Sequence, residues 1–139
     1  MDQTVKIAVC NRKTNLKYKN QEQPWSYLKE RNRTPIRTSE TAEEYKRASK
    51  NQRDAAKDHG GFVGGWLKDG RRLAPNVLSR GVGALDADSI PAEVDFPALV
   101  RDKLGGHEYF LYSTHSHTPE APRFRIAILF SREIGRAHV

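Results

Sequence analysis

Residues 108–130 read EYFLYSTHSHTPEAPRFRIAILF, and this stretch decides the fold. Its two ends, Glu108–Ser113 and Arg123–Phe130, are rich in aromatic and branched side chains, which predicts two β-strands. The segment between them, His115–Pro122, is polar and contains prolines, so it is expected to connect the strands. If the two strands are neighbours, polar side chains near this connection lie close together.

In the segments before residue 108, the spacing of apolar residues predicts further strands and helices. From residue 76 onward the predicted order is strand, helix, strand, strand. The predicted elements that precede residue 108 are a strand at Thr4–Cys10, a loop at Asn11–Gln23, a helix at Trp25–Arg31, a helix at about 42–58, a strand at Val77–Leu85 and a helix at Ala92–Leu104.

Two of these upstream segments carry additional signals. The helix at 42–58 begins with a capping box, Thr41 with Glu44, and has few apolar residues, so we expect it on the outside of the fold. The segment Gly60–Leu67 is dense in glycine yet contains Phe62. Glycine within a strand usually marks a bulge or the close approach of another backbone or a ligand.

Positive charge is concentrated at the start of the chain. The 139 residues include 24 Lys and Arg and 17 Asp and Glu, which leaves a net charge of +7. Residues 1–37 alone hold nine basic and three acidic residues. Such a segment suits nucleic acid, because Lys and Arg neutralise phosphates and release counterions. A solvated basic surface without a partner is the alternative.

Composition excludes several classes of protein. The single cysteine, Cys10, rules out a disulfide framework within the chain and a multi-cysteine zinc site. The apolar run Ile126–Phe130 has five residues, far fewer than the roughly 20 of a membrane helix. The N-terminus lacks the features of a secretory signal. We therefore expect a cytoplasmic protein with no membrane partner.

The last seven residues have a different origin from the rest of the chain in our interpretation. Residues 133–139, EIGRAHV, resemble the in-frame translation of a sequencing-library adapter, so we expect the natural reading frame to have been cut near Arg132. Residues 1–132 then form the N-terminal part of one domain, with a basic segment at 1–37 and the candidate motifs within 76–132. A natural C-terminus is the alternative.

The first candidate site is Leu85-Asp86-Ala87-Asp88. On a strand, side chains two residues apart share a face, so Asp86 and Asp88 are expected to project together. Close carboxylates repel each other unless a cation lies between them, and hard divalent cations prefer oxygen ligands. The pair suits a two-metal site for phosphoryl or nucleotidyl transfer. A solvated strand end or an Asx turn is the alternative.

Histidines follow the strand predicted at Glu108–Ser113. By the same alternation, Ser113, His115 and His117 are expected to share one face. A histidine beside a carboxylate–metal centre can bind metal, bind phosphate or transfer a proton. A surface histidine that only forms hydrogen bonds is the alternative.

Two arginines complete the candidate set. Arg123 and Arg125 are expected on one face of the last strand, with Phe124 and Ile126 on the other. Paired arginines bind phosphate through their forked donors, whereas an exposed polar strand face is the alternative. If the strands are neighbours, carboxylates, histidines and arginines meet on one sheet face. A metal, a triphosphate and a polyanion are the simplest ligands for that face.

These residues resemble the archaeo-eukaryotic primase (primase-polymerase) superfamily, in the branch found in phage and mobile-element primase-helicases. Members carry an Asp-x-Asp strand end, then a small-x-His motif, then a third acidic motif. The resemblance extends over nearly the whole chain to Arg132. It rests on Asn11–Asn20, Gly60–Leu67 with Gly70-Arg71-Arg72, Leu85–Asp88 and Tyr112–Arg125.

The resemblance implies an α+β fold, an RRM-like catalytic palm with helices packed on a mostly antiparallel sheet that is incomplete at its C-terminus. It implies that Asp86 and Asp88 are catalytic and hold Mg²⁺ or Mn²⁺. Either His115 or His117 fits the motif histidine as a further catalytic residue. The residues that it implies in nucleotide binding are Ser113, His115, His117, Arg123 and Arg125.

We therefore interpret the chain as part of a DNA primase-polymerase that joins nucleotides on a DNA template by two-metal transfer. Its partners would be DNA template and primer, nucleoside triphosphates and a helicase domain encoded downstream. The third acidic ligand is expected after Arg132, so this polypeptide alone is expected to bind metal weakly and to be inactive.

Two other functions remain open at this point. A rolling-circle replication endonuclease uses a His-hydrophobe-His metal motif and a tyrosine nucleophile, and His115-Ser116-His117 has that spacing but lacks the hydrophobic residue. A non-catalytic module would bind nucleic acid by stacking and charge. Such a module should expose aromatic side chains where this chain has Asp, His and Arg.

Overall fold

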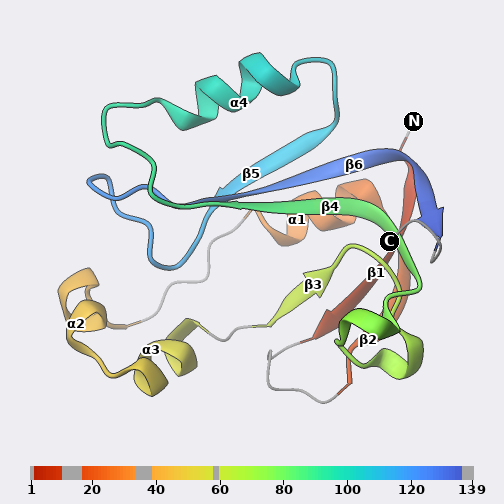
Figure 1. The fold of residues 1–139 in the computed structure, drawn as a ribbon, viewed down its shortest axis with the longest axis horizontal. Helices are drawn as coiled ribbons and strands as arrows, with labels where there is room; N and C mark the ends of the chain where they lie inside the picture. Colours follow the sequence, from red (N-terminus) through yellow and green to blue (C-terminus); the bar gives the residue numbers. More distant parts are fainter. Residues whose placement is uncertain (1, 11–16, 34–38, 58–59, 136–139) are drawn as a thin grey trace.

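The structure, a computed structural model, describes residues 2–10, 17–33, 39–57 and 60–135. These residues form two three-stranded antiparallel sheets and four α-helices (Figure 1). The strand order is β2-β1-β3 in the first sheet and β4-β6-β5 in the second. The predicted α+β class is confirmed, with the strands divided between two sheets.

The first sheet is built on β1 (Thr4–Cys10), which matches the predicted strand. It pairs with β2 (Lys19–Pro24) on one side and with β3 (Gly61–Val63) on the other. The prediction of a loop over Asn11–Gln23 is therefore wrong for the residues in β2, while residues 11–16 lie outside the described part of the chain. β2 is an edge strand without buried residues, so it lacks the hydrophobic alternation that would reveal it.

The helix predicted at 25–31 is confirmed as α1 (Trp25–Arg31). Its buried face carries Trp25 and Leu28, which share a core with β1 residues such as Ile7. The Trp25 ring lies 5.2 Å from that of Phe110 in the second sheet. This helix therefore packs between the two sheets and contributes to both.

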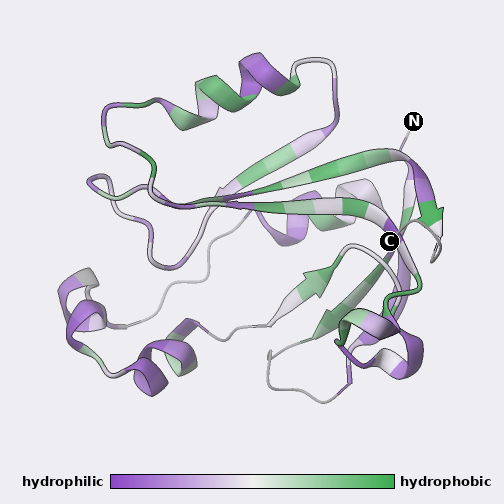
Figure 2. Cartoon of the chain, viewed as in Figure 1, coloured by the Kyte–Doolittle hydropathy of each residue, from purple (hydrophilic) through white to green (hydrophobic). Residues whose placement is uncertain are grey.

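The helix predicted at 42–58 is two helices, α2 (Ala42–Arg47) and α3 (Lys50–Lys57). The capping box of Thr41 and Glu44 is confirmed. The break follows from a second box, in which Ser49 Oγ accepts from the Gln52 amide at 3.2 Å and Gln52 Oε1 accepts from the Ser49 amide at 3.0 Å. Both helices are mostly hydrophilic and lie apart from the two sheets, as predicted (Figure 2).

A glycine pair joins the two sheets. The Gly64 carbonyl accepts hydrogen bonds from the amides of Gly81, at 2.9 Å, and Val82, at 3.2 Å. A Cβ at Gly64 would lie 2.1 Å from the Val82 carbonyl oxygen, and one at Gly65 would lie 1.6 Å from that of Ser79. The glycines were expected to mark a bulge or the close approach of another backbone or a ligand, and the structure shows the approach of another backbone.

The second sheet holds β4 (Ser79–Ala87), β5 (Tyr109–Ser113) and, between them, β6 (Phe124–Gly135). β4 starts later than the strand predicted at Val77–Leu85, because Val77 pairs with Leu67 in an isolated bridge outside the strand. β6 continues beyond the predicted end at Phe130.

One face of this sheet is covered by α4 (Phe96–Leu104), and the Phe96 ring stacks 5.5 Å from Phe124 (Figure 1). The helix begins later than the predicted Ala92 because the Asp95 side chain accepts from the Ala98 amide and caps it. The opposite face of the sheet contributes Val82 and Ala127 to the core shared with β1 and α1.

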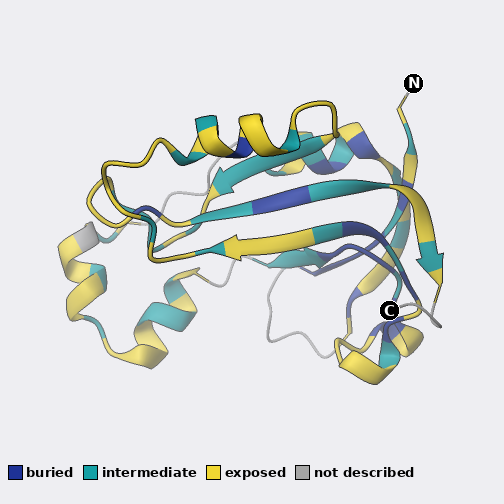
Figure 3. Ribbon diagram, turned by 45° about the horizontal axis from the view of Figure 1, so that its top comes forward, coloured by how far each residue is buried: buried dark blue, intermediate teal, exposed yellow. Residues whose placement is uncertain are grey.

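Burial is uneven along β4. Its first half is buried, whereas Ala84, Leu85 and Asp86 are exposed (Figure 3). In the part of the chain that the structure describes, no helix has both the length and the apolar character needed to cross a membrane.

Candidate functional site

Asp86, Arg125 and Tyr112 form a cluster across three neighbouring strands. They occupy one line of the register, so their side chains share a sheet face. Arg125 Nε donates to Asp86 Oδ1 at 2.6 Å, and Arg125 Nη1 donates to the Tyr112 hydroxyl at 3.4 Å. The predicted proximity of Asp86 and Arg125 therefore arises from direct strand pairing.

The charge on Arg125 is stable in this cluster. Partial burial acts to lower its pKa, but hydrogen bonds to Asp86 and Tyr112 outweigh burial and raise the pKa of Arg125 above its ordinary value. Arg125 therefore remains a cation at any physiological pH and stays available to pair with the Asp86 side chain.

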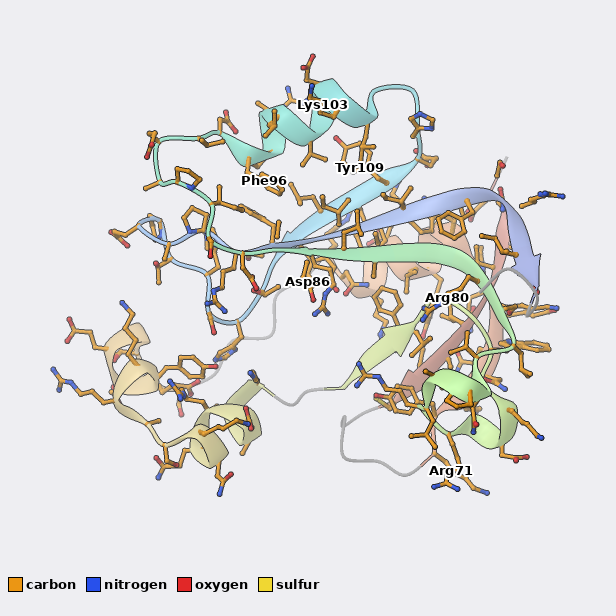
Figure 4. The ribbon with its side chains drawn as sticks, in the orientation of Figure 1. Arg71, Arg80, Asp86, Phe96, Lys103 and Tyr109 are labelled. Carbon is orange, nitrogen blue, oxygen red and sulfur yellow. The ribbon has the colours of Figure 1, made fainter. Side chains whose placement is uncertain are left out.

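This cluster borders a groove of about 860 Å³ between β4 and the residues around β3. Among the described residues that line the groove, three are arginines (Arg72, Arg80 and Arg125) and one is an acid, Asp86. Figure 4 shows Asp86 and Arg80 on the side of β4 that faces β3. The groove thus carries an excess of positive charge beside apolar lining residues such as Phe62 and Val63.

Tyr18 contributes a neutral polar group to the wall of the same groove. Burial, the largest cause, together with the nearby Cys10 thiol raises the pKa of Tyr18. Its phenol is therefore protonated at neutral pH and adds no negative charge that would oppose an anion.

Asp88 lies just beyond β4, which ends at Ala87. Both Asp86 and Asp88 are exposed. The next residue, Ser89, has a φ of 57° and takes the chain out of the extended conformation. Among the described residues, no group of three or more His, Cys, Asp and Glu is placed to hold a metal ion.

The strand that was predicted to carry Ser113, His115 and His117 on one face does not extend to the histidines. β5 ends at Ser113, and the His117 amide donates to the Thr114 carbonyl at 3.0 Å, which turns the chain. The expected alternation through Ser113, His115 and His117 is therefore wrong. Ser113 pairs with Phe124, which places it on the opposite sheet face from Arg125.

The two histidines have different neighbours. His115 Nε2 lies 3.2 Å from Glu40 Oε1, and its ring lies 4.7 Å from that of Tyr45 on α2. His117 Nδ1 accepts from the Arg123 backbone amide at 3.0 Å, and its ring meets the Phe124 ring at 4.9 Å. His117 therefore stabilises the connection between β5 and β6, whereas His115 links that connection to α2.

Arg123 lines a second, smaller pocket of about 330 Å³ together with residues of α3. The structure thus divides the predicted site residues: Asp86 and Arg125 border the groove, and Arg123 borders the pocket.

The prediction missed Arg80 and the cations of α3. Arg80 lies six residues before Asp86 on one strand, an even spacing that could have placed both on one face.

One protein-family model matches nearly the whole chain. A family model described as the VapE N-terminal domain matches residues 1–138. No curated protein and no solved structure matches the chain. The match includes both sheets, the groove and the pocket, so these features lie within one family domain.

Proposed function

Because the chain belongs to the VapE N-terminal domain family, we propose that it is part of a DNA primase-polymerase of a phage or mobile element. The family itself indicates a replication-associated protein of such an element. Nucleotidyl transfer, with DNA template, primer and nucleoside triphosphates as ligands and a helicase domain encoded downstream, is the finer part of this proposal. It includes an RRM-like palm made by β4, α4, β5 and β6.

The observation that carries the proposal is the groove beside Asp86. Three arginines and one carboxylate line it, and arginine forks are suited to the oxygens of a polyphosphate. A nucleotide or a nucleic-acid strand in the groove would place its phosphates near the acidic strand end. This arrangement supports the roles that the primase-polymerase resemblance implies for Asp86 and Arg125. The other residues with an implied role lie outside the groove lining: Asp88, Ser113, His115, His117 and Arg123.

The described residues do not by themselves fit a complete metal centre. Arg125 already holds Asp86 Oδ1 at 2.6 Å, and a guanidinium in that position competes with a cation for the carboxylate. Asp86 and Asp88 remain our proposed ligands for Mg²⁺ or Mn²⁺, with a third acidic ligand expected after Arg132.

The same ion pair favours a second candidate function. With Asp86 neutralised by Arg125, the groove can bind a polyanion without any metal. A non-catalytic nucleic-acid-binding module is therefore the alternative to the polymerase.

Template-dependent primer synthesis distinguishes the two functions. We would assay the reading frame extended past Arg132, with Mg²⁺ or Mn²⁺ and nucleoside triphosphates, and compare it with the double variant Asp86→Ala, Asp88→Ala. Synthesis should be lost in the double variant and kept in Asp102→Ala, which removes an exposed carboxylate on α4. Wild-type synthesis by the double variant would overturn the roles given to the carboxylates. DNA binding without synthesis by the unaltered protein would favour the non-catalytic module.

A further inference from the structure

The smaller pocket lies between α3 and the connection that leads from β5 to β6. Lys50, Arg53 and Lys57 reach it from α3, and Arg123 reaches it from the connection. Among the described residues that line it, Asp54 is the one acid. Segments about 70 residues apart in sequence thus place four cations around one small cavity.

Within the described part of the chain, ion pairs involve two of these four cations. Asp54 Oδ2 lies 2.9 Å from Lys50 Nζ, and Asp54 Oδ1 lies 3.5 Å from Lys57 Nζ. The hydrogen bond from Lys50 is the largest cause that lowers the pKa of Asp54, so this carboxylate is ionised at neutral pH. No carboxylate of the described residues pairs with Arg53 or Arg123.

Hydroxyl groups complete the lining of the pocket. Ser116 Oγ donates to the Tyr45 hydroxyl at 3.4 Å, which connects α2 to the β5–β6 connection. Tyr45 in turn packs against His115, whose Nε2 lies 3.2 Å from Glu40. The pocket therefore combines two guanidinium groups that pair with no described carboxylate and hydroxyl groups that can form hydrogen bonds, a set that matches the oxygens of a phosphate.

The pocket also lies next to the groove. Arg123 lines the pocket and Arg125 lines the groove. Two residue steps along an extended chain span about 6.6 Å, so one arginine of each cavity lies within this short distance along the backbone. A nucleic-acid strand bound in the groove can therefore continue toward the pocket.

We propose that the pocket formed by α3 and the β5–β6 connection binds a phosphate of the nucleic-acid backbone. This inference deepens the proposed function, because it extends the nucleic-acid path from the groove onto α3. Charges directed at phosphates position a strand without reading its bases. Binding at this pocket is therefore expected to be independent of sequence and sensitive to salt.

Binding of a short, labelled DNA single strand to the full chain tests this proposal by fluorescence anisotropy. Arg53→Glu should raise Kd about fivefold or more and reduce the slope of log affinity against log salt by about 0.7 for each phosphate that the protein ceases to neutralise. Arg47→Glu is the matched control, because Arg47 lies exposed on α2 and pairs with Glu43 at 3.6 Å. Its Kd should stay within about twofold of wild type.

Asp54→Asn provides a test in the opposite direction. Removing the one acid among the described lining residues should lower Kd for the same DNA strand, with circular dichroism used to check that α3 is intact. Equal Kd values for Arg53→Glu and Arg47→Glu would overturn the proposal.

Competition with a nucleoside triphosphate distinguishes the two sources of phosphate. If Arg53→Glu weakens triphosphate binding and leaves DNA affinity unchanged, the pocket serves a free nucleotide and the backbone proposal is overturned. The assay needs no catalysis. If the reading frame extended past Arg132 fails in primer synthesis while Arg53→Glu still weakens DNA binding, the proposed polymerase is refuted and this inference is supported.

Discussion

The two halves of the β4–β6 ladder differ in what their side chains do. In the half near Val82, that residue and Ala127 are fully buried and belong to the core shared with β1. In the half near Asp86, the neighbouring Leu85 is 56% exposed, and Asp86 meets Arg125 at the border of the groove. One pair of strands thus serves stability at one end and the candidate site at the other.

The difference arises from what covers each half. The Gly64–Gly65 segment binds the backbone at the start of β4, and α1 and β1 cover the adjoining side chains. The described elements leave the end of β4 exposed. Ligand-binding side chains can therefore change at one end with little effect on the packing at the other, which the following substitutions test in order of expected effect.

Gly65→Ala should break the buried half outright. Its Cβ would lie 1.6 Å from the Ser79 carbonyl oxygen, and two paired backbone segments cannot separate without losing their hydrogen bonds. We expect the free energy of unfolding to fall by about 3 kcal/mol or more, measured by urea denaturation with tryptophan fluorescence. Gly81→Ala is the control, because a Cβ there meets nothing within 4 Å; equal effects would show that the close approach is not needed.

Val82→Ala should weaken the same half by a smaller amount. The substitution removes two methyl groups from a fully buried side chain and leaves a small cavity between β4 and β1. We expect a loss of about 2 kcal/mol in the free energy of unfolding, measured by the same denaturation. A change below about 0.5 kcal/mol would mean that this half does not carry the core.

Arg125→Gln should separate function from stability in the exposed half. The ion pair with Asp86 is partly exposed, with side-chain exposures of 34% and 59%, and pairs of this kind contribute up to about 1 kcal/mol. We therefore expect a small change in unfolding free energy but a rise of about fivefold in Kd for single-stranded DNA. If stability falls by more than about 2 kcal/mol with DNA affinity unchanged, Arg125 is a structural residue.

Leu85→Ser should have the smallest effect. Because Leu85 is largely exposed, its replacement is expected to change the unfolding free energy by no more than about 0.5 kcal/mol and to leave DNA affinity unchanged. Calorimetry and anisotropy measure the two quantities. A large destabilisation would show that this half is covered in the folded protein.

Local signals in the sequence predicted the elements that depend on neighbouring residues. β1 follows from alternation, α1 from the spacing of Trp25 and Leu28, and the start of α2 from its capping box. The break between α2 and α3 also has a local signal, since Ser49 and Gln52 form a second box, but the prediction merged the two helices. β2 had no such signal, because an edge strand of polar residues depends on its partner.

For the candidate site, local alternation predicted that Arg125 and Phe124 would point to opposite faces of the sheet. The strand register confirms this. Local alternation failed at His115 and His117, because a turn after Ser113 ends the strand. The contribution of α3 could not be predicted from local spacing, since its cations meet Arg123 only through the folding of distant segments.

The α+β class was implied by the family resemblance. The amino-acid sequence by itself determined the positions of most strands and helices, and it indicated that the glycines of Gly60–Leu67 mark a bulge or the close approach of another backbone or a ligand. These features depend on side-chain periodicity, capping and backbone sterics, all of which act over a few residues. Only the tertiary structure decided that Asp86 pairs with Arg125, that the two histidines have separate neighbours, and that Arg123 and Arg125 line two different cavities. Those relations depend on strand register and on contacts between distant segments, which no local pattern encodes.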